Sequence, residues 1–257
     1  MTSCESLIYW LHFGPCKRLF RFLARRGLRS GHRILLGPAR GCAFEGADLA
    51  YQLGIYEIHV QRALARVLNK GSVLYDVGAN MGFFTLLGAK LVGDAGRVIA
   101  FEPSSDNCRA LRALCDSNDV RNVEMFSEAV SVTDGEAYFA ASASHAQGHL
   151  SAGREAESVK VRTVSLDSFA NNHVAPQVVL MDIEGAEVEA LRGASGLLSR
   201  PNAPAWIIEV HSSDNHTLVA GILRESGYTL TTLGPPVPRV GRYPIHLLAQ
   251  KPHARAC

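Results

Sequence analysis

The chain of 257 residues is 47% apolar and 19% charged, and its formal net charge is +2. These values are typical of a globular protein and exclude a collagen-like, coiled-coil or wholly disordered chain. No apolar run reaches the ~18–20 residues that a membrane-spanning helix needs, and the near-neutral charge argues against a chain-wide nucleic-acid surface.

The charge is unevenly distributed. Residues 1–50 carry eight Lys or Arg and three Asp or Glu, a net charge of +5, whereas residues 51–257 carry 18 and 21, a net charge of −3. We therefore predict a basic, partly helical N-terminal arm, 1–50, and a main domain, 51–257. Between residues 7 and 36 the arginines are interleaved with Leu and Phe. A basic amphipathic helix of this kind either packs on the main domain or contacts an anionic membrane surface.

The cysteines indicate a reducing compartment. The six of them form no C-x-x-C pair and no zinc-like spacing with histidine. The apolar run Leu7–Phe13 contains His12, precedes the basic cluster and lacks a following small-residue cleavage site, unlike a secretory signal. We expect free thiols and a cytoplasmic protein, peripheral to the inner membrane surface if the arm binds lipid.

Strand-like and helix-like patterns alternate along the main domain. After a helix at Glu57–Asn69, the predicted elements are strand 73–77, helix 83–91, strand 97–101, helix 104–117, strand 123–126, strands 129–133 and 136–140 on either side of the turn signal Asp134-Gly135, strand 159–164, strand 177–181, helix 186–198, strand 205–210, helix 215–225, and strands 228–233 and 245–250.

This order predicts an α/β fold of the Rossmann-like class. Strands that alternate with helices of about 10–14 residues imply a largely parallel sheet with helices on both faces. The last two strands are joined by the proline-rich segment Gly234–Pro244, which is too short for a crossover helix, so they form an antiparallel edge pair. The polar segment Ser142–Ser158 is either a surface loop or a lid over a site.

The sequence Asp76-Val77-Gly78-Ala79-Asn80-Met81-Gly82 joins the first strand of this domain to a helix. Glycines and a helix N-terminus at this place are typical of a nucleotide-cofactor loop. The dinucleotide fingerprint is absent, because Asn80 and Phe83 stand where it needs glycine. Asp76 favours a ligand with a cationic amine, because a carboxylate would repel a pyrophosphate.

Glu102 ends the next strand, where a carboxylate can accept hydrogen bonds from both hydroxyls of a ribose. An adenosine that carries an amino acid would satisfy both Asp76 and Glu102, which predicts S-adenosylmethionine as the cofactor. The alternative is an ordinary strand–helix turn in which Asp76 only caps the helix.

Several motifs together resemble one known family. DVGANMGFFT, AFEPSSDN, LDSF, VLMDIEGAEVEALRGA and IIEVH occur in the order and spacing of the FkbM-type S-adenosylmethionine-dependent methyltransferases, over roughly residues 50–215. The resemblance implies a class I methyltransferase fold with a seven-stranded sheet. It also implies methyl transfer, usually to a hydroxyl oxygen of a sugar, a macrolide or another natural product.

The same resemblance implies roles for individual residues. Glu128 matches a position that often lies near the adenine, although an acid exposed at a strand end is the alternative. Many members carry Lys two residues before Asp182, where this chain has Leu180, which puts any role of that Lys in doubt. The cofactor would be bound by Asp76, Gly78, Ala79, Asn80, Gly82, Glu102 and Glu128.

The candidate catalytic residues follow two later strands. Asp182 and Glu184 lie in the turn after strand 177–181, and Glu209 and His211 end strand 205–210 on the same side. Ligands of open α/β sheets bind beyond the carboxyl ends of the strands, so we predict Asp182, Glu184 and His211 as catalytic. His211 suits a general base that removes a hydroxyl proton. Alternatively, Asp182 caps the next helix, with Glu184 and Glu187 near its positive end.

Other interpretations stay open at this point. We predict no resident metal, but Asp182, Glu209 and His211 are a set that can bind a divalent cation, or Glu209 and His211 are a structural pair. Rival functions are a nicotinamide-dependent oxidoreductase and a non-catalytic, membrane-associated cofactor-binding scaffold. The expected acceptor is a hydroxyl of a sugar, glycan or secondary metabolite. Nucleic acid is disfavoured by the net charge of −3 on residues 51–257.

Overall fold

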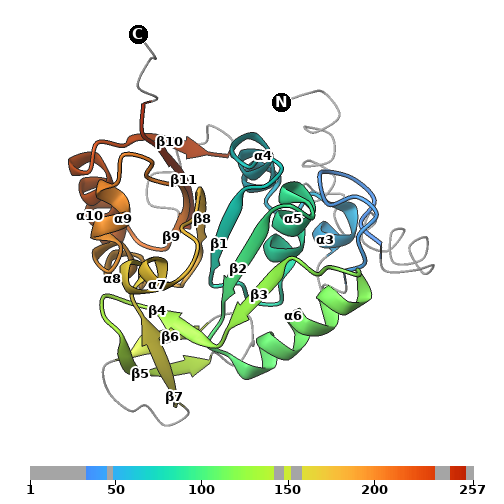
Figure 1. The fold of residues 1–257 in the computed structure, drawn as a ribbon, viewed down its shortest axis with the longest axis horizontal. Coiled ribbons are helices and arrows are strands. Elements are labelled where there is room, and N and C mark those ends of the chain that lie inside the picture. Colours follow the sequence, from blue (N-terminus) through green and yellow to red (C-terminus); the bar gives the residue numbers. More distant parts are fainter. Residues whose placement is uncertain (1–32, 45–48, 142–147, 152–157, 235–243, 253–257) are drawn as a thin grey trace, which may run out of the picture. The chain divides into compact units, whose positions relative to one another are not determined.

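The computed structural model describes residues 33–44, 49–141, 148–151, 158–234 and 244–252 (Figure 1). The chain divides into two compact units, Met1–Ile58 and His59–Cys257. We predicted the boundary between arm and main domain after residue 50, and that division stays a prediction. The predicted helix of the arm falls largely on residues 1–32, outside the described residues.

The first unit is described from Arg33 onward. An isolated antiparallel bridge joins Arg33 to Ala43. Helix α3 (Leu49–Leu53) follows, and the ring of Tyr51 stacks on that of Tyr56 with centroids 4.0 Å apart. Both contacts lie within this unit.

The second unit is built on a seven-stranded sheet in which β11 runs antiparallel to both of its neighbours, β9 and β10, and the other pairs are parallel. The predicted α/β class and the antiparallel pair near the C-terminus are thus confirmed. In spatial order the strands are β3 (Val123–Phe126), β2 (Arg97–Phe101), β1 (Val73–Val77), β8 (Val178–Met181), β9 (Ala205–Val210), β11 (Ile245–Gln250) and β10 (Thr229–Leu233).

Helices cover both faces of this sheet, as Figure 1 shows. Successive residues of β1 serve the two faces, because side chains alternate along a strand. Tyr75 and Val77 pack into the main core with Met181 and Trp206, whereas Leu74 faces α5. The helices are α4 (Ile58–Val67), α5 (Phe83–Val92), α6 (Ser105–Ser117), α7 (Leu166–Asn172), α8 (Glu187–Arg192), α9 (Ser195–Ser199) and α10 (Ser213–Glu225).

The predicted helix 186–198 is in fact two short helices, α8 and α9. Gly193 ends α8, and its N–H donates to the carbonyl of Glu189. A new helix then starts because the carboxylate of Asp167 accepts hydrogen bonds from the N–H groups of Gly196 and Leu197, at 2.7 and 2.8 Å. A side chain from α7 thus caps α9, which the local pattern does not reveal.

The two strands that we predicted on either side of Asp134 belong to a second, four-stranded sheet, in which they do not pair with each other. β4 pairs with β7, and β5 pairs with β7 and β6. Asp134 accepts hydrogen bonds from Ser165 N at 2.8 Å and Ser168 Oγ at 2.6 Å, at the start of α7. Part of the segment predicted as a loop or lid also forms a strand. The strands are β4 (Glu128–Val130), β7 (Ser158–Val164), β5 (Gly135–Ala141) and β6 (Gly148–Ser151).

The strand order of the large sheet positions the site. The chain passes from β1 to β2 on one side, and later enters β8 on the other side of β1. A ligand crevice forms beyond the carboxyl ends of the strands at such a switch point. The loop after β1, Glu102 after β2 and Asp182 after β8 all lie at this edge.

Candidate active site

Asp76 is a buried acid, 2% exposed, near the end of β1. Its Oδ2 accepts a hydrogen bond of 2.5 Å from Thr85 Oγ1 in the first turn of α5. Burial raises the pKa of Asp76 to about 6, the charge of Glu102 adds to this, and the Thr85 hydrogen bond opposes it. Asp76 therefore links β1 to α5 through this hydrogen bond. Sequence reasoning missed Thr85, which lies beyond the glycine-rich motif.

The two glycines of the loop are required by packing within the protein. Gly78 has φ +87°, and a Cβ there would lie 1.8 Å from the carbonyl oxygen of Asp182. Gly82 has φ +92°, and its Cβ would lie 2.2 Å from Leu111 Cδ1. We interpreted these glycines as typical of a nucleotide-cofactor loop. The structure gives them a further reason, which is the contact of the loop with the end of β8 and with α6.

Glu102 contacts the predicted cofactor loop directly. Its carboxylate accepts hydrogen bonds from Asn80 N at 2.8 Å, Ser104 N at 2.9 Å and Asn107 Nδ2 at 3.3 Å. Burial raises the pKa of Glu102, and these hydrogen bonds partly offset the rise. The two segments that we predicted to bind the cofactor are thus joined to each other.

Glu128 lies in the second sheet, at the first position of β4. Its Oε1 lies 2.9 Å from Arg162 Nη2 on β7, the neighbouring strand. The side chain has a structural partner, so the predicted role near the adenine stays a prediction.

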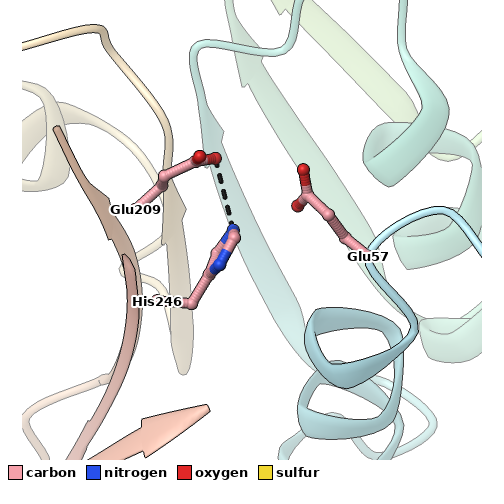
Figure 2. Close-up of side chains that lie close together, drawn as sticks. All are labelled: Glu57, Glu209 and His246. Atoms are coloured by element: carbon pink, nitrogen blue, oxygen red, sulfur yellow. Dashed lines mark ion pairs between the residues drawn. The ribbon is translucent and has the colours of Figure 1, made fainter. Parts of the chain in front are cut away.

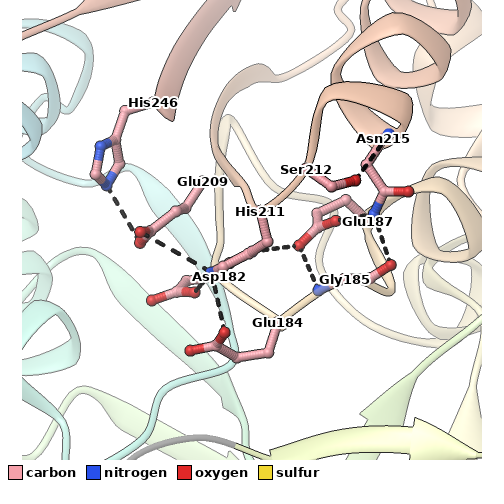
Figure 3. Close-up of polar contacts among 9 residues, drawn as sticks. All are labelled: Asp182, Glu184, Gly185, Glu187, Glu209, His211, Ser212, Asn215 and His246. Atoms are coloured by element: carbon pink, nitrogen blue, oxygen red, sulfur yellow. Dashed lines mark hydrogen bonds and ion pairs between the residues drawn. The ribbon is translucent and has the colours of Figure 1, made fainter. Parts of the chain in front are cut away.

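The predicted catalytic residues lie around one imidazole (Figure 3). His211 Nε2 is 3.2 Å from Glu184 Oε2 and 3.5 Å from Asp182 Oδ1. Glu209 is more distant, with its Oε1 3.9 Å from the same nitrogen. Asp182 and Glu184 come from the turn after β8, and Glu209 and His211 from the end of β9. Parallel pairing of β8 with β9 brings these ends together.

Glu187 is the residue that sequence reasoning underrated, because we gave it only a favourable place near a helix N-terminus. Its side chain is fully buried at the start of α8. Its Oε1 is 2.7 Å from His211 Nδ1 and accepts from Gly185 N at 2.8 Å. Its Oε2 accepts from Asn215 Nδ2 at 2.7 Å. The motif contained this acid, but its partner was not identifiable from sequence spacing.

The carboxylate of Glu209 pairs with His246 on β11 (Figure 2). This contact is shorter than the one between Glu209 and His211. Glu209 Oε2 lies 3.2 Å from His246 Nε2, because the antiparallel register places the two residues opposite each other. His246 Nδ1 lies 3.0 Å from His59 Nε2. Burial raises the pKa of Glu209, but the hydrogen bond and charge of His246 outweigh it, and the net direction is downward. Neither His246 nor His59 was among our candidates.

The surroundings of His211 favour its protonated form. Burial lowers its pKa, but the hydrogen bond to Glu187 and the charges of the neighbouring carboxylates outweigh burial and raise the pKa above its usual value. The neighbouring carboxylates therefore make this imidazole a better proton acceptor.

A cation set also exists among the described residues. Asp182, Glu184 and His211 each offer a ligand atom, and these atoms lie within 4.8 Å of one another. Our alternative metal set contained Glu209 in place of Glu184. The structure favours Glu184 in that set, because Glu209 is paired with His246.

The side chains of this edge fit S-adenosylmethionine. Asp76, Glu102 and Asp182 are carboxylic acids at the carboxyl ends of three adjacent strands, β1, β2 and β8. Acids here match a cationic amino acid and the hydroxyls of a ribose. The same acids would repel the pyrophosphate of a dinucleotide.

Comparison with known proteins decides the family. The model of the methyltransferase FkbM domain matches residues 76–230, more than half of the chain. This chain belongs to the FkbM methyltransferase family. It is therefore a methyltransferase with S-adenosylmethionine as its methyl donor, and the oxidoreductase and scaffold alternatives are set aside. The prediction from the motifs is confirmed.

Individual relatives agree with this assignment. The hexuronic acid methyltransferase AglP of Haloferax volcanii is 28% identical over 172 residues, which cover 66% of this chain and 69% of that protein. A putative rRNA methylase from Clostridium thermocellum has a TM-score of 0.51 at 9% identity, covering 74% of this chain and 91% of its own. The ribosomal protein L11 methylase of Lactobacillus delbrueckii subsp. bulgaricus has a TM-score of 0.51 at 11% identity, covering 77% and 78%. These structural similarities show the fold alone.

Within the described part of the chain, none of the helices combines the length and apolar character that crossing a bilayer requires.

Proposed function

We propose that this enzyme methylates a hydroxyl oxygen of a sugar or glycan. The observation that carries the proposal is the arrangement of His211, whose Nδ1 lies against buried Glu187 and whose Nε2 faces Asp182 and Glu184. The similarity to a hexuronic acid methyltransferase supports a sugar as the acceptor class.

Donor binding involves the loop after β1 and the acid after β2. Asp76, Glu102 and the backbone of residues 78–82 would hold S-adenosylmethionine, which supplies an electrophilic methyl group. The hydrogen bond from Asn80 N to Glu102 keeps the loop and the acid in a fixed relationship. Preorganisation of this kind favours methyl transfer, which depends mainly on alignment of the reacting atoms.

His211 acts as the general base in this proposal. Its Nε2 accepts the proton of the acceptor hydroxyl, which makes the oxygen a better nucleophile. The imidazolium that results is stabilised by Glu187 at Nδ1 and by the acids near Nε2. Such a base contributes about 10²–10⁴-fold to a rate.

In this proposal Asp182 and Glu184 bind the acceptor. Their carboxylates are partly exposed, at 37% and 26%, and lie on the Nε2 side of His211. A sugar offers neighbouring hydroxyls that donate hydrogen bonds, and two adjacent carboxylates accept them. A polyhydroxylated acceptor therefore suits this site better than a lone apolar hydroxyl compound.

The test is an acceptor panel with mass-spectrometric detection of one added methyl group. Neutral hexoses, hexuronic acids and their glycosides are offered with S-adenosylmethionine, beside amines and RNA. We expect a methylated sugar, and we expect His211→Ala to lower kcat by about 10²-fold or more, while His216→Ala on α10 retains activity. A wild-type enzyme that binds S-adenosylmethionine in calorimetry but methylates only amines or RNA would overturn the proposal.

Cellular location is a separate part of the proposal. We propose that the enzyme works in the cytoplasm, with residues 1–50 able to contact anionic lipid at the membrane surface. Co-sedimentation with phosphatidylserine vesicles tests the second point, because electrostatic binding weakens as salt rises. Equal recovery with neutral and anionic vesicles would argue against lipid contact.

A further inference from the structure

Glu187 joins three segments of the second unit. It accepts hydrogen bonds from Gly185 N in the turn after β8, from His211 Nδ1 at the end of β9, and from Asn215 Nδ2 in the first turn of α10. Burial of a carboxylate is unfavourable unless hydrogen bonds satisfy it. This one is fully buried and has donors on both oxygens.

These contacts decide where the proton of His211 lies. A carboxylate that already accepts from Gly185 and Asn215 can only accept from the imidazole as well. The 2.7 Å contact therefore requires the proton on Nδ1. In the neutral ring this leaves the lone pair on Nε2, the nitrogen that faces Asp182 and Glu184.

We infer that Glu187 is a positioning residue for methyl transfer, which keeps His211 in the Nδ1-protonated form and stabilises the imidazolium after proton uptake at Nε2. The inference rests on the proposed function. Glu187 acts through His211 and does not contact the acceptor, because its side chain is fully buried on the opposite side of the ring from Asp182 and Glu184.

Asn215 completes the arrangement. Its Nδ2 donates to Glu187 Oε2 and to the carbonyl oxygen of Gly185, both at 2.7 Å. Its own N–H donates to Ser212 Oγ at 3.1 Å, within the cap of α10. Asn215 thereby limits rotation of the Glu187 carboxylate, so that Oε1 stays directed at His211.

The experiment compares E187Q with a matched control, E189Q. Glu189 lies on the same helix, two residues further, and is exposed. Nitrogen-15 NMR of the full chain reads the tautomer and pKa of His211, and steady-state kinetics with the sugar acceptor reads kcat and KM. Thermal melting verifies that each variant is folded.

We expect wild type and E189Q to show the neutral ring protonated at Nδ1. In E187Q the pKa of His211 falls by about 1 unit or more, because the stabilising charge is gone. The value of kcat falls about 10²-fold with a much smaller change in acceptor KM, since the lost interaction acts in the transition state. If E187Q does not fold, N215A serves instead, and a mixture of tautomers is expected.

Two results would overturn the inference. One is a wild-type His211 whose neutral ring is protonated at Nε2. The other is an E187Q or N215A variant with an unchanged tautomer, an unchanged pKa and an unchanged pH profile of kcat. The NMR measurement needs no acceptor, so failure to methylate any sugar would count against the proposed function and not against this placement of the proton.

Discussion

The backbone N–H of Asn80 donates a 2.8 Å hydrogen bond to Glu102 Oε2, which ties the loop after β1 to the end of β2. The acid expected to bind the ribose therefore also supports the loop expected to hold the rest of the donor. A single substitution at Glu102 affects both contributions to donor binding.

Removal of the Glu102 charge should weaken donor binding. We expect E102Q to raise the Kd for S-adenosylmethionine at least about tenfold, equivalent to about 1.4 kcal/mol, because charge-assisted hydrogen bonds are stronger than neutral ones. Isothermal titration calorimetry measures this. The control is E124Q, an exposed acid on neighbouring β3. Equal Kd values for E102Q and E124Q would contradict the role of Glu102.

The close packing of Gly78 against the end of β8 should make substitution of this glycine destabilising. Gly78 and Gly71 have nearly the same φ, +87° and +86°, but a Cβ at Gly71 meets nothing within 4 Å. We expect G71A to lower the free energy of unfolding by about 1 kcal/mol, because of backbone strain. G78A should lose at least about 2 kcal/mol more, since its Cβ would collide with the Asp182 carbonyl. Urea unfolding measures both, and similar losses would mean that the loop adjusts.

Buried Asp76 should make stability depend on pH. Its pKa is about 6 in the folded protein against a usual value of 3.8, so the folded state binds more protons between these values. Stability from this group is present below about pH 4 and is lost as pH rises through about 6, by up to about 3 kcal/mol. D76N lacks this titrating group. Its free energy of unfolding minus that of the wild type should therefore increase from about pH 4 to about pH 7. Parallel stability profiles would contradict the raised pKa.

Loss of His246 should leave Glu209 as a buried charge without its ion-pair partner on β11. We expect H246A to destabilise the fold by about 3 kcal/mol at neutral pH, since breaking a buried pair is costly. The pKa of Glu209 should then rise, because burial remains while the favourable contacts of His246 are gone. The destabilisation should therefore shrink as the pH is lowered and Glu209 takes up a proton. A loss that is independent of pH would point to lost packing alone.

Activity should not require a divalent cation. In the proposed mechanism His211 Nε2, which lies within 3.5 Å of Asp182 and Glu184, takes up the hydroxyl proton directly, so no bound cation is needed to activate the acceptor. We expect dialysis against EDTA to leave kcat unchanged. Loss of activity that Mg²⁺ or Mn²⁺ restores would instead assign Asp182, Glu184 and His211 to a metal, through the set that they form.

Much of the fold follows from local patterns. The β1 segment Val73–Val77 is a continuous buried run, as expected for a parallel strand covered on both faces. Helix α6 begins within one residue of the predicted start at 104, and Ser104 is its N-cap, with an Oγ that accepts from Asn107 N. The single helix 186–198 was wrong because Asp167 on α7, distant in sequence, caps a new helix at α9. The strands on either side of Asp134 do not pair with each other, because β7 lies between β4 and β5.

The strand–turn–helix after β1 was predictable because its glycines, its acid and the following helix are consecutive in the chain, where turn chemistry acts locally. The side-chain partners of His211 and Glu209 were not predictable in this way. His211 is 24 residues from Glu187, and Glu209 meets His246 only because β11 enters the sheet antiparallel beside β9. Which acid faces which nitrogen depends on strand order and register, and those are set by packing of the whole core and not by neighbouring residues.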